Sequence, residues 1–171
     1  EQELSVVSFG VPVAEYNLSF TVGAILGGTL LKQGESFHFE QGWLGSVSGS
    51  RQWRFGENQD RFVTGTLSTG ISKANASKKS AGSASIMGVD IRVGAIAGIT
   101  LWDALSPYLL ARGFGGPILW NEGSTTTMGT DKHHFQLGAG MNLKLFEKVF
   151  VLVDASLLGE KSLSLAASLF F

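Results

Sequence analysis

Alternation of apolar and polar residues with a period of two is the feature that most constrains the fold of this chain. Residues 18–26 place apolar side chains at every second position, with small or polar residues between them. Because successive side chains of a strand point to opposite faces, this pattern predicts a strand with one apolar face. The pattern recurs in residues 37–55, 63–71, 87–99, 107–119, 135–145, 149–157 and 163–171, so the sequence predicts eight strands.

The links between these segments alternate between two kinds. Tight links lie at residues 57–60, 102–106 and 146–148, and the intervening links are more polar. Two of the polar links, residues 72–83 and 115–132, are long, whereas residues 32–35 and 159–161 are short. No helix-length segment separates two strands, which predicts an antiparallel meander. An even strand number with tight turns at one end and longer loops at the other is typical of bacterial outer-membrane barrels.

Composition indicates which face of such a barrel is apolar. Only 16% of the residues are charged, and glycine accounts for 23 of 171. A water-soluble barrel needs Lys and Glu on its outer face, whereas here the polar phase holds mostly Ser, Thr and Gly, which suits a crowded interior. Aromatic residues also gather near both strand ends, as in the girdles at the two membrane interfaces. The predicted girdle residues are Phe20, Phe37, Phe39, Trp43, Trp53, Phe55, Trp102, Phe135, Phe146 and Phe171.

The last segment carries a resemblance to a known family. Its apolar residues alternate and the chain ends on Phe171, which resembles the C-terminal assembly signal of outer-membrane barrels; the residues concerned are Leu165, Ala167, Leu169 and Phe171. Over residues 17–171 the chain resembles the small eight-stranded outer-membrane proteins of the OmpA-barrel and OmpX type. The resemblance implies insertion by the barrel assembly machinery and multi-pass location in the bacterial outer membrane, surrounded by its lipid and lipopolysaccharide.

The predicted fold class is therefore all-β, an eight-stranded antiparallel up-and-down transmembrane β-barrel over residues 17–171. Residues 1–16 are predicted to be a periplasmic lead-in or a short plug, because Pro12 is expected to interrupt any ladder there. The acidic N-terminus lacks the positive region of a signal peptide, so the chain is expected to be mature.

The polar phase also contains ionisable residues of both signs. They are Glu40, Arg54, Asp90, Arg92, Arg112, Lys144 and Asp154. An eight-stranded interior is only wide enough for side chains to fill it, so these charges are expected to pair and to close the lumen. The alternative is a selectivity constriction for a small solute.

Other chemistry finds little support in the sequence. The chain has no cysteine, which excludes thiolate catalysis, and a net charge of -1 argues against nucleic acid as a partner. His38, His134 and Glu40 could form a cluster near Ser46, but no segment matches the His-Ser motif of lipid A deacylase barrels. Polar residues at a barrel rim are more often solvated than catalytic, so no catalytic residue, metal or cofactor is expected.

The predicted function is non-enzymatic. The barrel would act as a structural or interaction protein whose surface loops, residues 72–83 and 115–132, meet a protein partner or lipopolysaccharide. A narrow route for small or hydrophobic solutes is the alternative, and a lipid-modifying enzyme is the third possibility.

Overall fold

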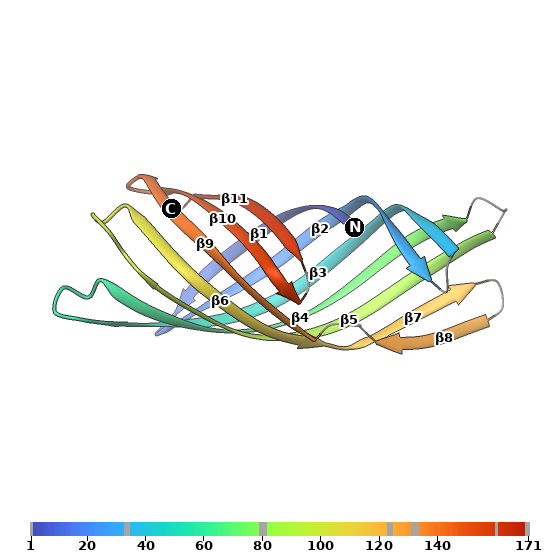
Figure 1. Cartoon of the computed structure of the whole chain (residues 1–171), viewed down its shortest axis with the longest axis horizontal. Coiled ribbons are helices and arrows are strands. Elements are labelled where there is room, and N and C mark those ends of the chain that lie inside the picture. The colour runs from blue at the N-terminus through green and yellow to red at the C-terminus, as the bar shows by residue number, and fades with distance from the viewer. Residues whose placement is uncertain are drawn as a thin grey trace. The chain divides into compact units, whose positions relative to one another are not determined.

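The computed structural model describes residues 2–32, 35–78, 82–122, 125–130, 134–159 and 161–169. These residues form a single eleven-stranded antiparallel sheet (Figure 1). The strands are β1 (Gln2–Val13), β2 (Tyr16–Lys32), β3 (Glu35–Phe55), β4 (Arg61–Lys78), β5 (Gly82–Ile99), β6 (Leu105–Gly115), β7 (Pro117–Glu122), β8 (Thr125–Thr130), β9 (Phe135–Phe146), β10 (Val149–Gly159) and β11 (Ser162–Leu169). Pairing follows the order β1-β2-β3-β4-β5-β6-β9-β10-β11, while β7 pairs with β5 and β8.

The all-β antiparallel prediction is confirmed, and the described residues form eleven strands where the sequence predicted eight. Seven of the eight predicted segments lie on β2, β3, β4, β5, β9, β10 and β11, the last of them as far as Leu169, and the segment 107–119 runs from β6 into β7. The additional strands are β1, β7 and β8. They lie in the predicted lead-in, residues 1–16, and in the predicted loop, residues 115–132.

Strand β1 occupies most of the predicted lead-in. It pairs with β2 throughout, and Pro12 lies opposite Asn17 in that ladder, so the expectation that Pro12 interrupts pairing is wrong. The physical reason is the position of β1 at the start of the pairing order. A proline lacks only the N–H donor. On an edge strand the proline nitrogen can face away from the neighbouring strand, where no hydrogen bond of the ladder is lost.

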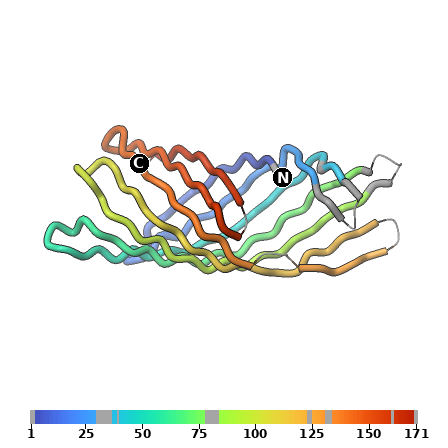
Figure 2. The backbone as a smooth tube through the Cα atoms, viewed as in Figure 1, coloured from blue at the N-terminus to red at the C-terminus, as the bar shows by residue number. Residues whose placement is uncertain are grey.

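The two long polar links are also mostly strand. Within the predicted loop 72–83, β4 continues to Lys78 and β5 begins at Gly82. The Ser- and Lys-rich composition conceals an alternation in which Ala74 and Ala76 are buried. The predicted loop 115–132 contains the β7–β8 hairpin, which Figure 2 traces as two adjacent antiparallel segments.

Gly116 allows the chain to pass from β6 to β7. A Cβ atom at this position would overlap the backbone carbonyl of Val89 on β5. The missing side chain therefore lets the main chain approach β5 closely, and β7 then pairs with β5 from Ile118 opposite Gly88 to Glu122 opposite Ala84.

The chain divides into two compact units, and strands β3, β4 and β5 contribute residues to both. The first unit comprises residues 1–49, 68–91 and 115–131, and the second comprises residues 50–67, 92–114 and 132–171.

The core of the first unit centres on an aromatic pair. The rings of Phe37 and Trp120 meet edge to face, with centroids 4.7 Å apart and planes at 79°. Small and aliphatic side chains surround them: Ile25, Ala74, Ala76 and Ala84 are buried, and Leu44 and Ile86 pack against the cluster. Phe37 is only 2% exposed, so its predicted place in an exposed girdle is wrong. It faces Trp120 because the β7–β8 hairpin, absent from the prediction, brings that ring to it.

The core of the second unit is smaller. Phe62, Tyr108 and Leu110 are buried together, with Ile96 and Leu152 packed against them. These residues come from β4, β5, β6 and β10, so one cluster joins strands distant in the sequence.

Truncation of Trp120 should loosen the first unit. We expect Trp120→Ala to lower the free energy of unfolding by about 3–5 kcal/mol, since it removes a buried aromatic ring from the cluster. Met128→Ala, on the same hairpin but exposed, should stay within about 0.5 kcal/mol of the parent chain. Chemical unfolding followed by circular dichroism measures both variants, and equal losses would refute the role given to Trp120.

Candidate functional site

In the second unit, buried and exposed side chains alternate along the strands, so each strand has one buried face and one exposed face. On β6, Tyr108 and Leu110 are 8% and 3% exposed, whereas Leu109 between them is 68% exposed. On β9, Gln136 is buried while Phe135 and Leu137 on either side are exposed. The phase that the sequence marked as polar is therefore the buried face of these strands.

Tyr108 and Asp154 form the best defined polar contact on this face. The Tyr108 hydroxyl donates a hydrogen bond to Asp154 Oδ1 at 2.5 Å. Gly140 on β9 lies opposite both residues, opposite Tyr108 on β6 and Asp154 on β10. A Cβ atom on Gly140 would lie 2.5 Å from Asp154 Oδ1 and 2.6 Å from the Tyr108 hydroxyl oxygen. The two side chains meet across β9 because Gly140 leaves the space empty.

A second polar contact lies along the same strands. Gln136 Nε2 donates a hydrogen bond to Ser162 Oγ at 2.8 Å, and this contact bridges from β9 to the start of β11. Gln136 is opposite Arg112 on β6. Tyr108, Asp154 and Gln136 on this face thus each have a hydrogen-bond partner on another strand.

The other ionisable residues of the predicted lumen occupy separate surroundings. In the second unit, the Arg92 guanidinium lies 5.6 Å from the ring centroid of Phe114. In the first unit, Thr69 Oγ1 donates to the backbone carbonyl of Asp90 at 3.2 Å, and Glu40 is exposed. The structure brings two of the predicted residues, Arg54 and Lys144, to one pocket.

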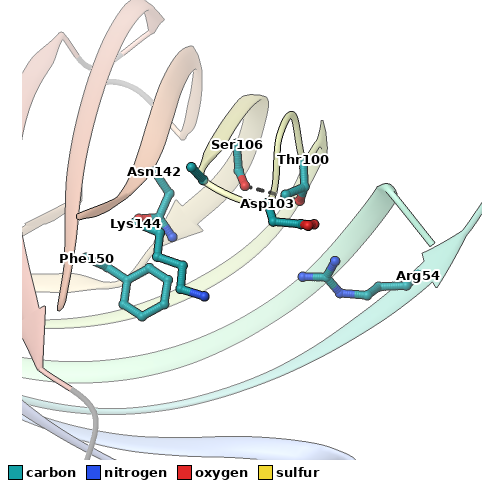
Figure 3. A pocket seen from close by; sticks show the side chains of 8 residues that line it. Arg54, Thr100, Asp103, Ser106, Asn142, Lys144 and Phe150 are labelled. Atoms are coloured by element: carbon teal, nitrogen blue, oxygen red, sulfur yellow. Dashed lines mark hydrogen bonds between the residues drawn. The ribbon is translucent and has the colours of Figure 1, made fainter. Parts of the chain in front are cut away.

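This pocket has a volume of about 470 Å³ and belongs entirely to the second unit. Its lining residues are Arg54, Thr100, Asp103, Ala104, Ser106, Asn142, Lys144 and Phe150. Figure 3 shows the charged ends of Arg54, Asp103 and Lys144 turned into it. Two positive groups and one negative group therefore share a cavity large enough for a small molecule.

Arg54 is held in place at the end of β3. Its Nε donates to Gln52 Oε1 at 3.2 Å, and its Nη1 donates to the backbone carbonyl of Gln59 at 3.2 Å. These two contacts fix the plane of the guanidinium, since its donors have a rigid fork geometry.

Asp103 reaches the pocket through the tight turn between β5 and β6. The Ala104 N–H donates to the Leu101 carbonyl at 3.1 Å, and the central residues Trp102 and Asp103 have φ of 51° and 56°. Positive φ at both central positions is the geometry of a type I′ hairpin turn. The sequence predicted a tight link here, but not the contribution of Asp103 to a site.

Asn142 is the second lining residue that sequence reasoning missed. Its Oδ1 atom is buried and has no hydrogen-bond partner among the described residues. Its place beside Lys144 in the polar phase of β9 was the available signal, but the alternation alone did not reveal which strands would converge there.

Most of the predicted girdle and assembly-signal residues are exposed. The exposed girdle residues are Phe20, Trp43, Trp53, Phe55, Trp102, Phe135 and Phe146, and the exposed signal residues are Leu165, Ala167 and Leu169. The side chains of Phe39 and Phe171 lie outside the described part of the chain.

The histidine cluster gains no support. His38, His134 and Glu40 are each exposed, and His133 lies outside the described residues. Among the described residues, no group of three His, Asp or Glu side chains is arranged to hold a metal ion.

Comparison of the chain with protein-family models, curated proteins and solved structures gave no match. Within the described ranges, no helix is long and apolar enough to cross a membrane.

The Tyr108–Asp154 contact provides a direct test of this face. Gly140→Ala should separate the two side chains and lower the free energy of unfolding by about 1–3 kcal/mol, because a buried carboxylate loses its donor. Gly129→Ala on β8 is the matched control, since a Cβ atom there meets nothing within 4 Å. Urea unfolding compares the two variants, and a Gly140→Ala chain as stable as Gly129→Ala would contradict the close packing described here.

Proposed function

We propose that the chain is an integral β-barrel of the bacterial outer membrane with a structural or interaction role. Its spanning strands are the eight predicted ones, β2 to β6 and β9 to β11, with apolar side chains toward lipid and polar side chains within. It is not an enzyme, and outer-membrane lipid and lipopolysaccharide surround it.

The observation that carries this proposal is the exposure of the apolar phase. On β5, Ile91 and Val93 are 56% and 59% exposed, and the apolar residues of β2 and β9 are exposed in the same alternation. Water-soluble monomers rarely expose contiguous apolar patches of this kind. Lipid-facing strands of outer-membrane barrels alternate in this way by construction.

The exposed aromatic residues support the same reading. Trp53, Phe55, Trp102 and Phe146 lie at or beside the tight links of the second unit, and Trp102 is 85% exposed at the tip of its turn. Tryptophan, with one polar and one apolar end, favours the membrane interface, and outer-membrane barrels carry girdles of aromatic residues there.

The filled polar face favours a structural role over a general pore. Tyr108 pairs with Asp154 and Gln136 pairs with Ser162 on the buried face, so side chains occupy that space. Protein partners would meet the β7–β8 hairpin, which replaces the long loop expected at residues 115–132. The exposed alternating residues of β11 would serve as the signal read by the assembly machinery. Steady ion-selective conductance in planar bilayers would favour the transport alternative instead.

The proposal leaves β1 outside the spanning set. With β1 the main pairing order holds nine strands, whereas single-chain bacterial barrels have even numbers. Every described side chain of β1 is exposed, as are those of β11, but β11 supplies Ser162 to the buried Gln136 and is therefore kept in the set.

An arginine substitution on the exposed face separates a membrane protein from a water-soluble one. In phospholipid vesicles, Val93→Arg should cost about 2–4 kcal/mol of unfolding free energy, because the charge enters the hydrocarbon region. A half-buried polar control, Thr66→Arg, should cost less there, since Thr66 belongs to the polar phase of β4 and does not face lipid in this proposal.

The order reverses if the exposed face meets water. Val93→Arg then changes the free energy of unfolding by no more than about 0.5 kcal/mol, because the position is exposed to water. Thr66→Arg becomes the more destabilising of the two variants, because its longer side chain is crowded. That reversed order in urea titrations would reject the membrane proposal.

Removal of β1 tests the strand count. We expect a chain lacking residues 1–13 to insert into vesicles and to unfold at the same temperature as the parent chain in gel electrophoresis, because the spanning set is intact without β1. Loss of folding in this variant would show that β1 belongs to the set.

A further inference from the structure

We propose that the pocket of the second unit binds a small zwitterion that carries both a phosphate-type oxyanion and a primary ammonium group. This proposal does not depend on the membrane location, because every lining residue belongs to one compact unit. It assigns a ligand to a cavity that the structural role leaves unused.

The charges of the lining select for an anionic group. Arg54 on β3 and Lys144 on β9 both turn into the cavity (Figure 3). The Nε and one Nη1 donor of Arg54 are held by Gln52 and Gln59, so the guanidinium is oriented before a ligand arrives. Arg and Lys together are the usual protein partners of phosphate oxygens.

A second feature selects for a positive hydrogen-bond donor. Asp103 supplies the one carboxylate of the lining, and this carboxylate turns into the cavity (Figure 3). A carboxylate repels an oxyanion and attracts an ammonium group. An ammonium group of the ligand can therefore face Asp103 while the oxyanion meets Arg54 and Lys144.

The overall balance fits one molecule of this type. Two positive side chains and one negative side chain leave the pocket with one excess positive charge. A phosphate monoester with an ammonium group has the opposite excess at neutral pH. The Phe150 ring and Ala104 supply an apolar wall for a short carbon linker between the two charged groups of the ligand. The hydroxyls of Thr100 and Ser106 are hydrogen-bonded to each other at 3.2 Å.

Phosphoethanolamine is the probe that tests the pocket. The full folded chain, labelled with ¹⁵N, is titrated with phosphoethanolamine, inorganic phosphate and ethanolamine, and the side-chain amide signal of Asn142 reports on the site. We expect saturable binding of phosphoethanolamine and affinities about tenfold weaker for either fragment, because each fragment loses one set of contacts.

Variants then assign the contacts. Arg54→Gln and Lys144→Gln should each weaken phosphoethanolamine binding about tenfold or more, since each removes a charged partner of the oxyanion. Asp103→Asn should abolish the preference for phosphoethanolamine over inorganic phosphate. Lys148→Gln, an exposed cation outside the lining, is the matched control and should bind like the parent chain.

The outcomes also distinguish the source of the ligand. If nanodiscs that contain phosphatidylethanolamine shift the Asn142 signal and soluble phosphoethanolamine competes, the zwitterion is a lipid headgroup; binding of the soluble probe alone indicates a free metabolite. Absence of saturable binding, equal affinity for inorganic phosphate, or unchanged affinity in both cation variants would overturn the proposal.

Discussion

The antiparallel ladder is the constraint on which the other features of this molecule depend. Residues directly opposite each other on neighbouring antiparallel strands share one face of the sheet. Leu109 is opposite Ala139, and Tyr108 is opposite Gly140, so the exposed phase of β6 continues into the exposed phase of β9 and the buried phase into the buried phase. A shift of one residue would move every side chain of a strand to the wrong face. The division between an exposed apolar face and a buried face that mixes apolar and polar side chains is therefore a property of the register.

Register also explains where the small residues lie. Large side chains on the buried face of the second unit are opposite glycines: Leu110 is opposite Gly138, and Tyr108 and Asp154 are both opposite Gly140. At Gly98 a Cβ atom would come within 2.6 Å of the Phe62 ring and 2.8 Å of Tyr108 Cβ. Gly98, Gly138 and Gly140 therefore admit large side chains from neighbouring strands and do not serve turns.

The alternation predicted the position and the facing of most strands, because that information is local. It missed β1, because proline is a poor strand residue only where its N–H is needed, and pairing order is not visible in a single segment. It missed the β7–β8 hairpin, because the Ser-, Thr- and Gly-rich composition of that segment resembles a loop. It therefore also missed Trp120, the residue of this hairpin that packs against Phe37. For the pocket, the polar phase identified Arg54 and Lys144. Asp103 and Asn142 required knowledge of a turn conformation and of cross-strand neighbours, which no local pattern encodes.

The degree of burial decides how each charge of the polar face is satisfied. The expectation from sequence was that acids and bases would pair with each other throughout a narrow interior. Asp154, which is nearly buried, instead accepts a hydrogen bond from the neutral Tyr108 hydroxyl. A neutral donor satisfies the carboxylate without the desolvation of a second ion. A phenol is therefore a less costly partner than a cation for a buried carboxylate. Arg54, Asp103 and Lys144 are exposed around an open pocket, where solvent screens charged groups. Exposed charges remain available to a ligand, whereas the carboxylate of Asp154 is already occupied by its hydrogen bond. The difference in burial between the two sets of charges therefore makes the pocket, and not the buried face, the place where a ligand can bind.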